Sequence, residues 1–365
     1  MRIELMRRWD YTYECVTLLN QHVDGEATER YIGGFCARHG LDRERLEPLF
    51  AEIWAVQRQV LPAVDTADAA VGKYFRSLHG AADECLASLL LAPPVGQEVQ
   101  EYIQGLLAHT PRQRLRWLGQ VVLGHIQARI FPADELDAIG SVEQLLRAVF
   151  AESIPGDDKL LLAEICVNTD VVLRDLAGIM GRAIAAFRQA EGLLEPRLRE
   201  SLAHLEALIG RPGLTLGDLT EGRLNGQASP DSVLYFYPTA MCSYSRRYNI
   251  SDAYEETLHY GINVPALRQL VETADAAVNA PEILRLLGDA TKQDILHRLR
   301  AGRMYGQELA AALGLSTATI SYHMNLLIQQ RMVSAERENT RIYYSLDGKG
   351  MARAVEVIGK FLGVE

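Results

Sequence analysis

Small polar side chains recur along one face of a segment in the last quarter of the sequence. Thr317, Ser321 and Asn325 are spaced by four, so on a helix they share one stripe. Short hydroxyl and amide side chains let a helix enter the major groove of DNA, where they match the donors and acceptors of base edges. The pattern predicts a DNA-contacting helix, and the full set of candidates is Ser316, Thr317, Thr319, Ser321, Tyr322, His323, Asn325, Arg337 and Arg341.

The opposite face of this segment is apolar, and the turn before it carries helix-ending and helix-starting signals. Ile320, Met324 and Leu327 recur at spacings of four and three, which places them on an inner helical face. Gly314 can end the preceding helix because glycine adopts positive φ readily, and Ser316 can cap the next one. Two helices joined by a tight turn that contains glycine form the helix-turn-helix pattern.

The flanking residues predict the remaining elements of a winged helix-turn-helix domain at residues 281–365. Arg337 and Arg341 flank a two-residue turn, Asn339-Thr340, where a hairpin would place them against DNA phosphates. The expected elements are two short helices broken near Gly288, helices over 307–314 and 317–331, strands over 332–338 and 341–346, and a closing helix over 351–362.

This segment resembles the winged-helix DNA-binding domain of the ArsR (ArsR/SmtB-type) bacterial regulators over about 80 residues. Residues 287–296 are similar to the first signature of that family, with Lys292 where Arg is usual. Residues 315–327 match its recognition-helix pattern, and residues 332–344 look like its wing. The resemblance implies a double-stranded DNA operator as partner and a homodimer formed by the first and last helices of the domain.

Metal sensing, which is common in that family, does not fit these residues. Its sensors resemble one another in a cysteine-containing pair before the recognition helix or in His and acidic ligands on the last helix. Residues 305–310 hold no cysteine here, and residues 351–362 hold no histidine. The chain's five cysteines lie at least 21 residues apart, so no Cys-x-x-Cys pair exists. We therefore expect no metal and no cofactor, with reduced thiols; a scattered thiol acting as a sensor is the alternative.

Residues 1–280 predict a large, mostly helical domain with a small sheet near residues 231–264. Apolar residues at spacings of three and four fill the first 210 positions. A long helical pattern from 171 to 209, interrupted at Gly192 and Pro196, predicts one or two further helices. Residues 232–238 and 256–264 are rich in β-branched and aromatic side chains, as strands are. A polar stretch lies between them. The predicted fold class is therefore mainly α, with this domain followed by the winged helix-turn-helix domain.

Aromatic residues are concentrated in the predicted sheet. Residues 235–260 hold seven of the chain's 26 aromatic side chains. They either pack the sheet against the helices or form the wall of a ligand pocket, since such pockets are mostly apolar with a few polar groups. The ligand-binding candidates are Tyr235, Tyr237, Tyr244, Tyr248 and His259.

Charge and composition narrow the class of protein. The net charge of −10 alone argues against nucleic-acid binding, but residues 281–365 carry +2 and residues 1–280 carry −12. Residues 1–10 lack the apolar core of a secretory signal, and no apolar run approaches the ~18 residues that span a bilayer. We therefore expect a cytoplasmic protein with no membrane partner. Glycine-rich phosphate loops and zinc-protease or hydrolase motifs are absent from the sequence, so no enzyme is predicted.

The sequence predicts a dimeric DNA-binding transcriptional regulator, with repression favoured. In one hypothesis, residues 1–280 sense a small-molecule effector that controls DNA binding. In the second, they form a ligand-free protein-interaction or oligomerisation scaffold. An enzyme fused to a DNA-binding domain is the third.

Overall fold

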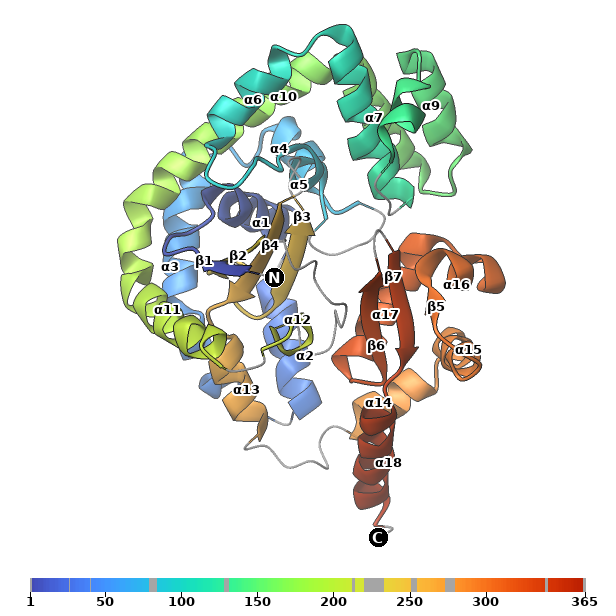
Figure 1. Cartoon of the computed structure of the whole chain (residues 1–365). Helices are drawn as coiled ribbons and strands as arrows, with labels where there is room; N and C mark the ends of the chain where they lie inside the picture. Colours follow the sequence, from blue (N-terminus) through green and yellow to red (C-terminus); the bar gives the residue numbers. More distant parts are fainter. Residues whose placement is uncertain are drawn as a thin grey trace. The chain divides into compact units, whose positions relative to one another are not determined.

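The chain folds into two compact units. Figure 1 draws the computed structural model of the whole chain. The structure describes residues 2–25, 27–39, 41–78, 84–127, 131–211, 214–219, 233–250, 255–272, 280–338 and 341–363. The first unit holds Met1–Thr28, Glu47–Ile209 and Pro230–Pro265, and the second holds Glu29–Leu46, Gly210–Ser229 and Ala266–Glu365. The domain boundary expected after residue 280 adjoins residues 273–279, which lie outside the described residues, and it stays a prediction.

Helices make up most of the first unit. They are α1 (Tyr11–Val23), α3 (Ala51–Val60), α4 (Ala69–Phe75), α5 (Leu86–Leu90), α6 (Val99–Leu107), α7 (Pro111–Gln127), α8 (Ala133–Asp137), α9 (Val142–Ala151), α10 (Gly156–Ala190) and α11 (Glu195–Ile209). The long α10 contacts α1, α3, α6 and α9, and it runs along the outside of this unit in Figure 1. Its backbone leaves helical geometry at Asn168 (φ −113°, ψ 31°). The interruption expected at Gly192 is a 3-10 turn, Glu191–Leu194, whereas Pro196 lies in the first turn of α11.

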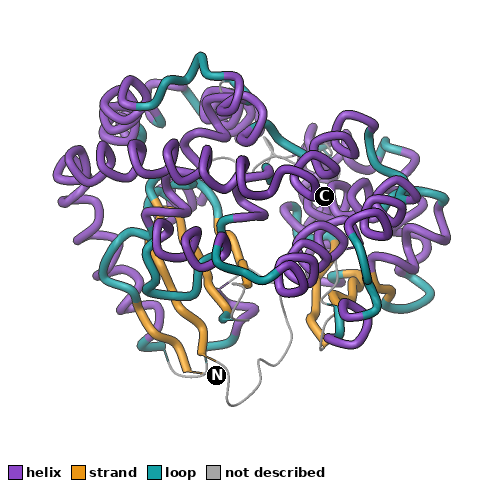
Figure 2. The backbone as a smooth tube through the Cα atoms, turned by 90° about the horizontal axis from the view of Figure 1, so that it is seen from above, coloured by secondary structure: helices purple, strands orange, loops and turns teal. Residues whose placement is uncertain are grey.

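A four-stranded sheet completes the first unit, with helices packed beside it (Figure 2). Its strand order is β1 (Arg2–Leu5), β2 (Val233–Thr239), β4 (Glu256–Gly261), β3 (Arg246–Ile250). The first three strands are parallel, and β3 runs antiparallel to β4. Helix α11 contacts β1 and β2. Leu234, Phe236 and Leu258 are fully buried, so the sheet contributes to the core of the unit.

The sheet differs from its sequence prediction in three places. The predicted strand over 256–264 ends at Gly261, and α13 (Val264–Glu272) begins three residues later. The stretch expected to be only polar contains β3, an edge strand, where exposure permits polar side chains. The N-terminal strand β1 was not predicted, because four residues carry little pattern and its partner β2 lies some 230 positions away.

The second unit contains the predicted winged helix. Its elements are α14 (Ala280–Leu287), α15 (Ala290–Leu299), β5 (Met304–Tyr305), α16 (Gly306–Leu313), α17 (Thr317–Gln329), β6 (Val333–Glu338), β7 (Arg341–Leu346) and α18 (Gly348–Leu362). The three strands are ordered β5-β7-β6. Helices α2 (Ala27–His39) and α12 (Leu216–Leu219) lie mainly or wholly in the remaining segments of this unit. The mainly helical fold with a C-terminal winged helix is confirmed.

The winged helix has its own apolar core. Ile320, Met324 and Leu327 of α17 are fully buried, as their spacing predicts. Leu309 of α16 and Met332, which precedes β6, are also fully buried. The predicted turn Asn339-Thr340 lies outside the described residues. The strand predicted over 341–346 has those bounds in the structure.

Candidate nucleic-acid interface

The turn between α16 and α17 is built from the signals present in the sequence. Gly314 ends α16 in the left-handed conformation (φ 67°), and Ser316 caps α17 by accepting the Thr319 N–H at 3.0 Å. The Ser316 and Thr319 hydroxyl oxygens also lie 2.8 Å apart. These two candidates therefore hold the start of the helix, which fixes the direction of the remaining side chains.

The outer face of α17 presents uncharged polar side chains. Ser321 and Asn325 are exposed, Tyr322 is 57% exposed and Thr317 is half-buried. The opposite face is anchored in the core, so the helix cannot rotate without exposing that apolar stripe. The arrangement can present hydroxyl and amide groups to the edges of base pairs.

His323 lies at the edge of this face and is neutral at neutral pH. Its ring meets Tyr322 edge-on at 5.4 Å, and its Nδ1 is buried without a hydrogen-bond partner among the described residues. Burial lowers the pKa of His323, and the charge of Lys292 lowers it further. His323 therefore offers a neutral imidazole beside the proposed base-contacting residues.

Lys292, where the resemblance leads one to expect Arg, is a buried cation beneath α17. It is 4% exposed, and its Nζ lies 2.9 Å from Asp289 Oδ2. Asp289 also caps α15 by accepting the Lys292 N–H at 3.0 Å. The pKa of Asp289 is lowered by these contacts, led by the side-chain hydrogen bond. The pair therefore supports the junction of α15 and α17 rather than an exposed DNA contact.

Two arginines and two tyrosines form a cluster on the wing sheet. The Arg341 guanidinium lies 4.6 Å from the Tyr305 ring centroid, and Arg303 lies 4.7 Å from that of Tyr343. The two tyrosine rings meet edge-on at 5.7 Å. Arg303 also lies 3.8 Å from Glu336, and both guanidinium groups are solvent-exposed, so the cluster brings two cations to the surface of the wing. Arg341 was predicted from the sequence, whereas Arg303 was missed because it precedes β5, a two-residue strand with little pattern.

Arg337 occupies β6 opposite Ile342 of β7, and Glu338 is opposite Arg341.

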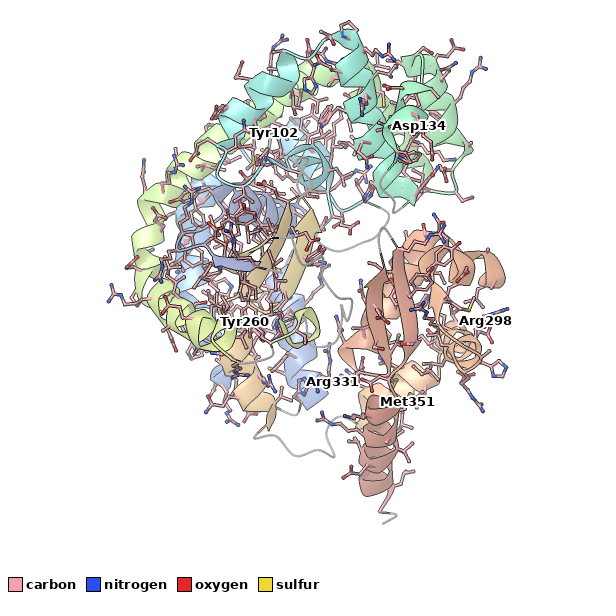
Figure 3. All side chains as sticks on the ribbon, viewed as in Figure 1. Tyr102, Asp134, Tyr260, Arg298, Arg331 and Met351 are labelled. Atoms are coloured by element: carbon pink, nitrogen blue, oxygen red, sulfur yellow. The ribbon has the colours of Figure 1, made fainter. Side chains whose placement is uncertain are left out.

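Arg298, visible on α15 in Figure 3, donates to the carbonyl oxygen of Ala312 at 2.8 Å. This contact satisfies one of the free carbonyls at the end of α16. Arg298 therefore braces the helix before the turn.

The first and last helices of the winged helix leave apolar side chains in water. Helices α14 and α18 pack against each other. Leu284 of α14 is 40% exposed, and Val355, Phe361 and Leu362 of α18 are 69%, 47% and 63% exposed. Ile358 is partly buried against the core. Helices with such exposed apolar residues are typical of an interface.

The predicted ligand-binding residues divide into two groups in the first unit. A cavity of about 330 Å³ is bordered by Tyr237, Tyr248 and His259. Tyr235 and Tyr244 do not line it; Tyr235 is half-buried, and the Tyr244 ring lies 6.5 Å from Phe50. The cavity thus lies next to the aromatic stretch, but only some residues of that stretch line it.

His259 has four partners at this cavity. Its ring is stacked with that of Tyr13 at 3.8 Å and with that of Tyr237 at 5.3 Å between centroids. Its Nε2 lies 3.0 Å from Asp10 Oδ2, and its Nδ1 lies 3.3 Å from Asn249 Nδ2. Burial alone would raise the pKa of Asp10, but the hydrogen bond and charge of His259 lower it overall. His259 is therefore a fixed part of the wall.

Asp10 and Tyr13 were missed by sequence reasoning because they are separated from His259 by 249 and 246 positions. One local signal was present. Asp10 caps α1 by accepting the Tyr13 N–H at 3.1 Å, a role that its position before the helix indicates. That signal locates the helix start, but it does not reveal the contact with His259.

The cysteines and other common ligand types do not assemble into a metal site within the described residues. No group of three or more His, Cys, Asp or Glu side chains there could hold an ion. All five cysteines are free thiols, and four of them are buried. Burial raises the pKa of Cys15, Cys85 and Cys166, which disfavours the thiolate that binds metals.

Among the helices of the described ranges, none combines the length and the hydropathy required to cross a bilayer.

Known proteins match the winged helix. The family described as "Bacterial regulatory protein, arsR family" matches residues 289–335. The Transcriptional repressor SdpR of Bacillus subtilis (strain 168) is 34% identical over 65 residues, covering 18% of this chain and 72% of SdpR. The HTH-type transcriptional regulator KmtR of Mycobacterium tuberculosis is 32% identical over 74 residues, covering 20% of this chain and 57% of KmtR.

A third relative extends the same pattern. The uncharacterized HTH-type transcriptional regulator YdfF of Bacillus subtilis is 32% identical over 79 residues, covering 21% of this chain and 35% of YdfF. Each of these matches thus involves about a fifth of the chain. On the match to SdpR, together with the recognition helix and wing described above, this chain belongs to the arsR family of bacterial regulatory proteins.

Proposed function

We propose that this chain is a dimeric transcriptional repressor that binds a pseudo-palindromic operator and is controlled by a small molecule in its first unit. The observation that carries the DNA-binding part is the face of α17, where Ser321 and Asn325 are exposed above a fully buried apolar stripe. The stacked Arg341 and Arg303 supply cations for phosphates. Repression is favoured because the relative SdpR is named a transcriptional repressor.

The dimer in this proposal is formed by α14 and α18. Burying Val355, Phe361 and Leu362 against a second copy would remove apolar surface from water. Each Å² of apolar surface buried stabilises the dimer by roughly 25 cal/mol. A two-fold axis there would place two copies of α17 in successive major grooves, about 34 Å apart.

Selection from random-sequence duplexes tests the operator. The full chain is expected to enrich an inverted repeat with half-sites about one helical turn apart. A reporter promoter that contains this repeat should then lose transcription when the protein is expressed. Enrichment of a single asymmetric site, or activation of the reporter, would contradict the corresponding part of the proposal.

Sedimentation at micromolar concentration tests the dimer. The double variant Val355→Asp, Phe361→Asp is expected to be a monomer, because each carboxylate would face apolar surface across the interface. Phe150→Asp, at a 49% exposed position of α9, is the matched control and should leave the dimer intact. A monomeric wild type would overturn this part of the proposal.

Metal ions are expected to leave operator affinity unchanged. Residues 305–310 hold no cysteine and α18 holds no histidine, so the chain lacks the thiolate and imidazole ligands that a transition metal needs there. Titrations of operator DNA with and without stoichiometric zinc, cadmium or arsenite should give the same Kd. A tenfold loss of affinity would show that other cysteines assemble into a sensor.

The sensor role rests on the cavity beside Tyr237 and His259. Its volume of about 330 Å³ falls at the lower end of the range for small-molecule pockets. The second candidate, an interaction scaffold, is favoured by exposed apolar residues on α10, namely Leu160, Val167 and Val171. A ligand that raises the melting temperature of the full chain and lowers its operator affinity would support the sensor. A partner protein lost on Val167→Asp would support the scaffold.

A further inference from the structure

The acidic groups that border the cavity of the first unit each have a basic side chain close by. Asp10 is paired with His259 at 3.0 Å. Glu98 receives two hydrogen bonds of 2.8 Å from Arg188. Glu84 lies 4.0 Å from His125. A cationic ligand would therefore have to compete with groups already in place for each of these carboxylates.

Two arginines border the same cavity. Arg8 is exposed at its rim and makes no hydrogen bond or ion pair within the described part of the chain. Burial raises the pKa of Tyr237, and Arg8 is near enough to oppose that rise. Arg247 reaches the cavity from β3, where it is paired in register with His259. Two separate segments of the chain thus bring positive charge to the cavity.

Aromatic rings form part of the remaining wall. Trp9, Tyr13 and Tyr248 line the cavity together with Tyr237. Tyr13 and Tyr237 each stack with His259, so the positions of those rings are fixed before a ligand binds. Such walls favour a flat apolar body, and guanidinium groups favour a carboxylate, which they can bind with two parallel hydrogen bonds.

We propose that this cavity binds a small aromatic carboxylic acid. The acid's ring packs against the tyrosine wall, and its carboxylate pairs with Arg8 and Arg247. This inference rests on the proposed sensor role, for which it supplies the chemical class of the effector. A cationic aromatic ligand is disfavoured because Asp10 and Glu98 are already paired.

Calorimetric titration of the full chain without DNA tests the chemical class. The probes are benzoate, phenylacetate and indole-3-acetate, with phenylacetamide and phenethylamine as neutral and cationic counterparts. At least one acid is expected to bind, with phenylacetamide and phenethylamine at least about tenfold weaker, since charge-assisted hydrogen bonds are lost. Failure of all three acids to bind, or tighter binding of the amine, would overturn the inference.

Variants locate the site. Arg8→Gln and Arg247→Gln should each weaken the acid that binds by about tenfold or more. Arg7→Gln is the matched control, because its neighbour Arg8 lines the cavity whereas Arg7 pairs with Glu206 on the surface. Unchanged affinity in both cavity variants would overturn the inference. Binding that depends on Arg8 but leaves operator affinity unchanged would uphold the site and refute the sensor role.

Discussion

The contacts inside the winged helix and those inside the first unit join residues at very different separations in the sequence. Ser316 caps α17 through Thr319, three residues away, and Glu338 is paired with Arg341 in the wing. In the first unit, Asp10 contacts His259 across 249 positions, and Glu14 contacts Met241 across 227. The local contacts of the winged helix leave a pattern in the sequence, whereas the distant contacts of the first unit do not.

The largest expected effect lies at a close backbone approach in the winged helix. A Cβ at Gly350 would overlap the carbonyl oxygen of Arg331. Gly350→Ala should therefore cost about 3 kcal/mol or more in the free energy of unfolding of the winged helix, because the backbone must move. Gly348→Ala, where nothing lies within 4 Å, is the matched control on the same helix.

Hydrogen exchange resolves this effect by region. Amides of α17 should lose protection in Gly350→Ala, while those of α1 keep it, as expected for two separate compact units. Equal loss of protection in both helices would show that the two regions unfold as one, which contradicts the prediction of independent stability.

The second largest effect is expected at a buried carboxyl group of the first unit. Glu14 is fully buried, and its carboxylate accepts the N–H groups of Ala240 at 2.9 Å and Met241 at 2.7 Å. Burial raises the pKa of Glu14 from 4.5 to about 7. The folded state therefore holds this proton more tightly than the unfolded state, so stability is full below pH 4.5 and is lost as pH rises towards 7.

The loss attributable to Glu14 over that interval is on the order of 3 kcal/mol. Glu14→Gln should remove this part of the pH dependence and cost one hydrogen bond, because the amide NH₂ would face a backbone N–H. Denaturant unfolding between pH 4.5 and pH 7.5 measures it, with the exposed Glu200→Gln as control. If Glu14→Gln keeps the wild-type pH profile, the distant contact does not carry the expected energy.

Sequence reasoning succeeded where the determinants are neighbours. The glycine end of α16, the serine cap of α17 and its buried face follow from residues within one or two helical turns. Even there, two helix ends differ from the predicted ones, and each difference has a local cause. Helix α17 ends at Gln329 rather than residue 331, where Arg331 takes positive φ (55°). Helix α18 starts at Gly348 rather than 351, because Asp347 accepts the N–H groups of Lys349 and Gly350.

The first unit could be predicted only in outline. Its helices leave a periodic pattern, but β1 is short and β3 is a polar edge strand, so neither stands out. The aromatic stretch indicated the neighbourhood of the cavity. The other wall comes from α1 and from residues 84–98, which no local signal connects to that stretch.

In the proposed complex with DNA, α17 contacts bases while the wing contacts phosphates. Titrating single variants against the selected operator and a random duplex at several salt concentrations tests it most directly, with Gln329→Ala at the far end of α17 as control. Ser321→Ala or Tyr322→Ala should cost roughly 1 to 3 kcal/mol on the operator and little on random DNA. Arg341→Gln should weaken both and lower the salt slope by about one. Equal losses on both duplexes for Ser321→Ala and Tyr322→Ala would contradict the claim.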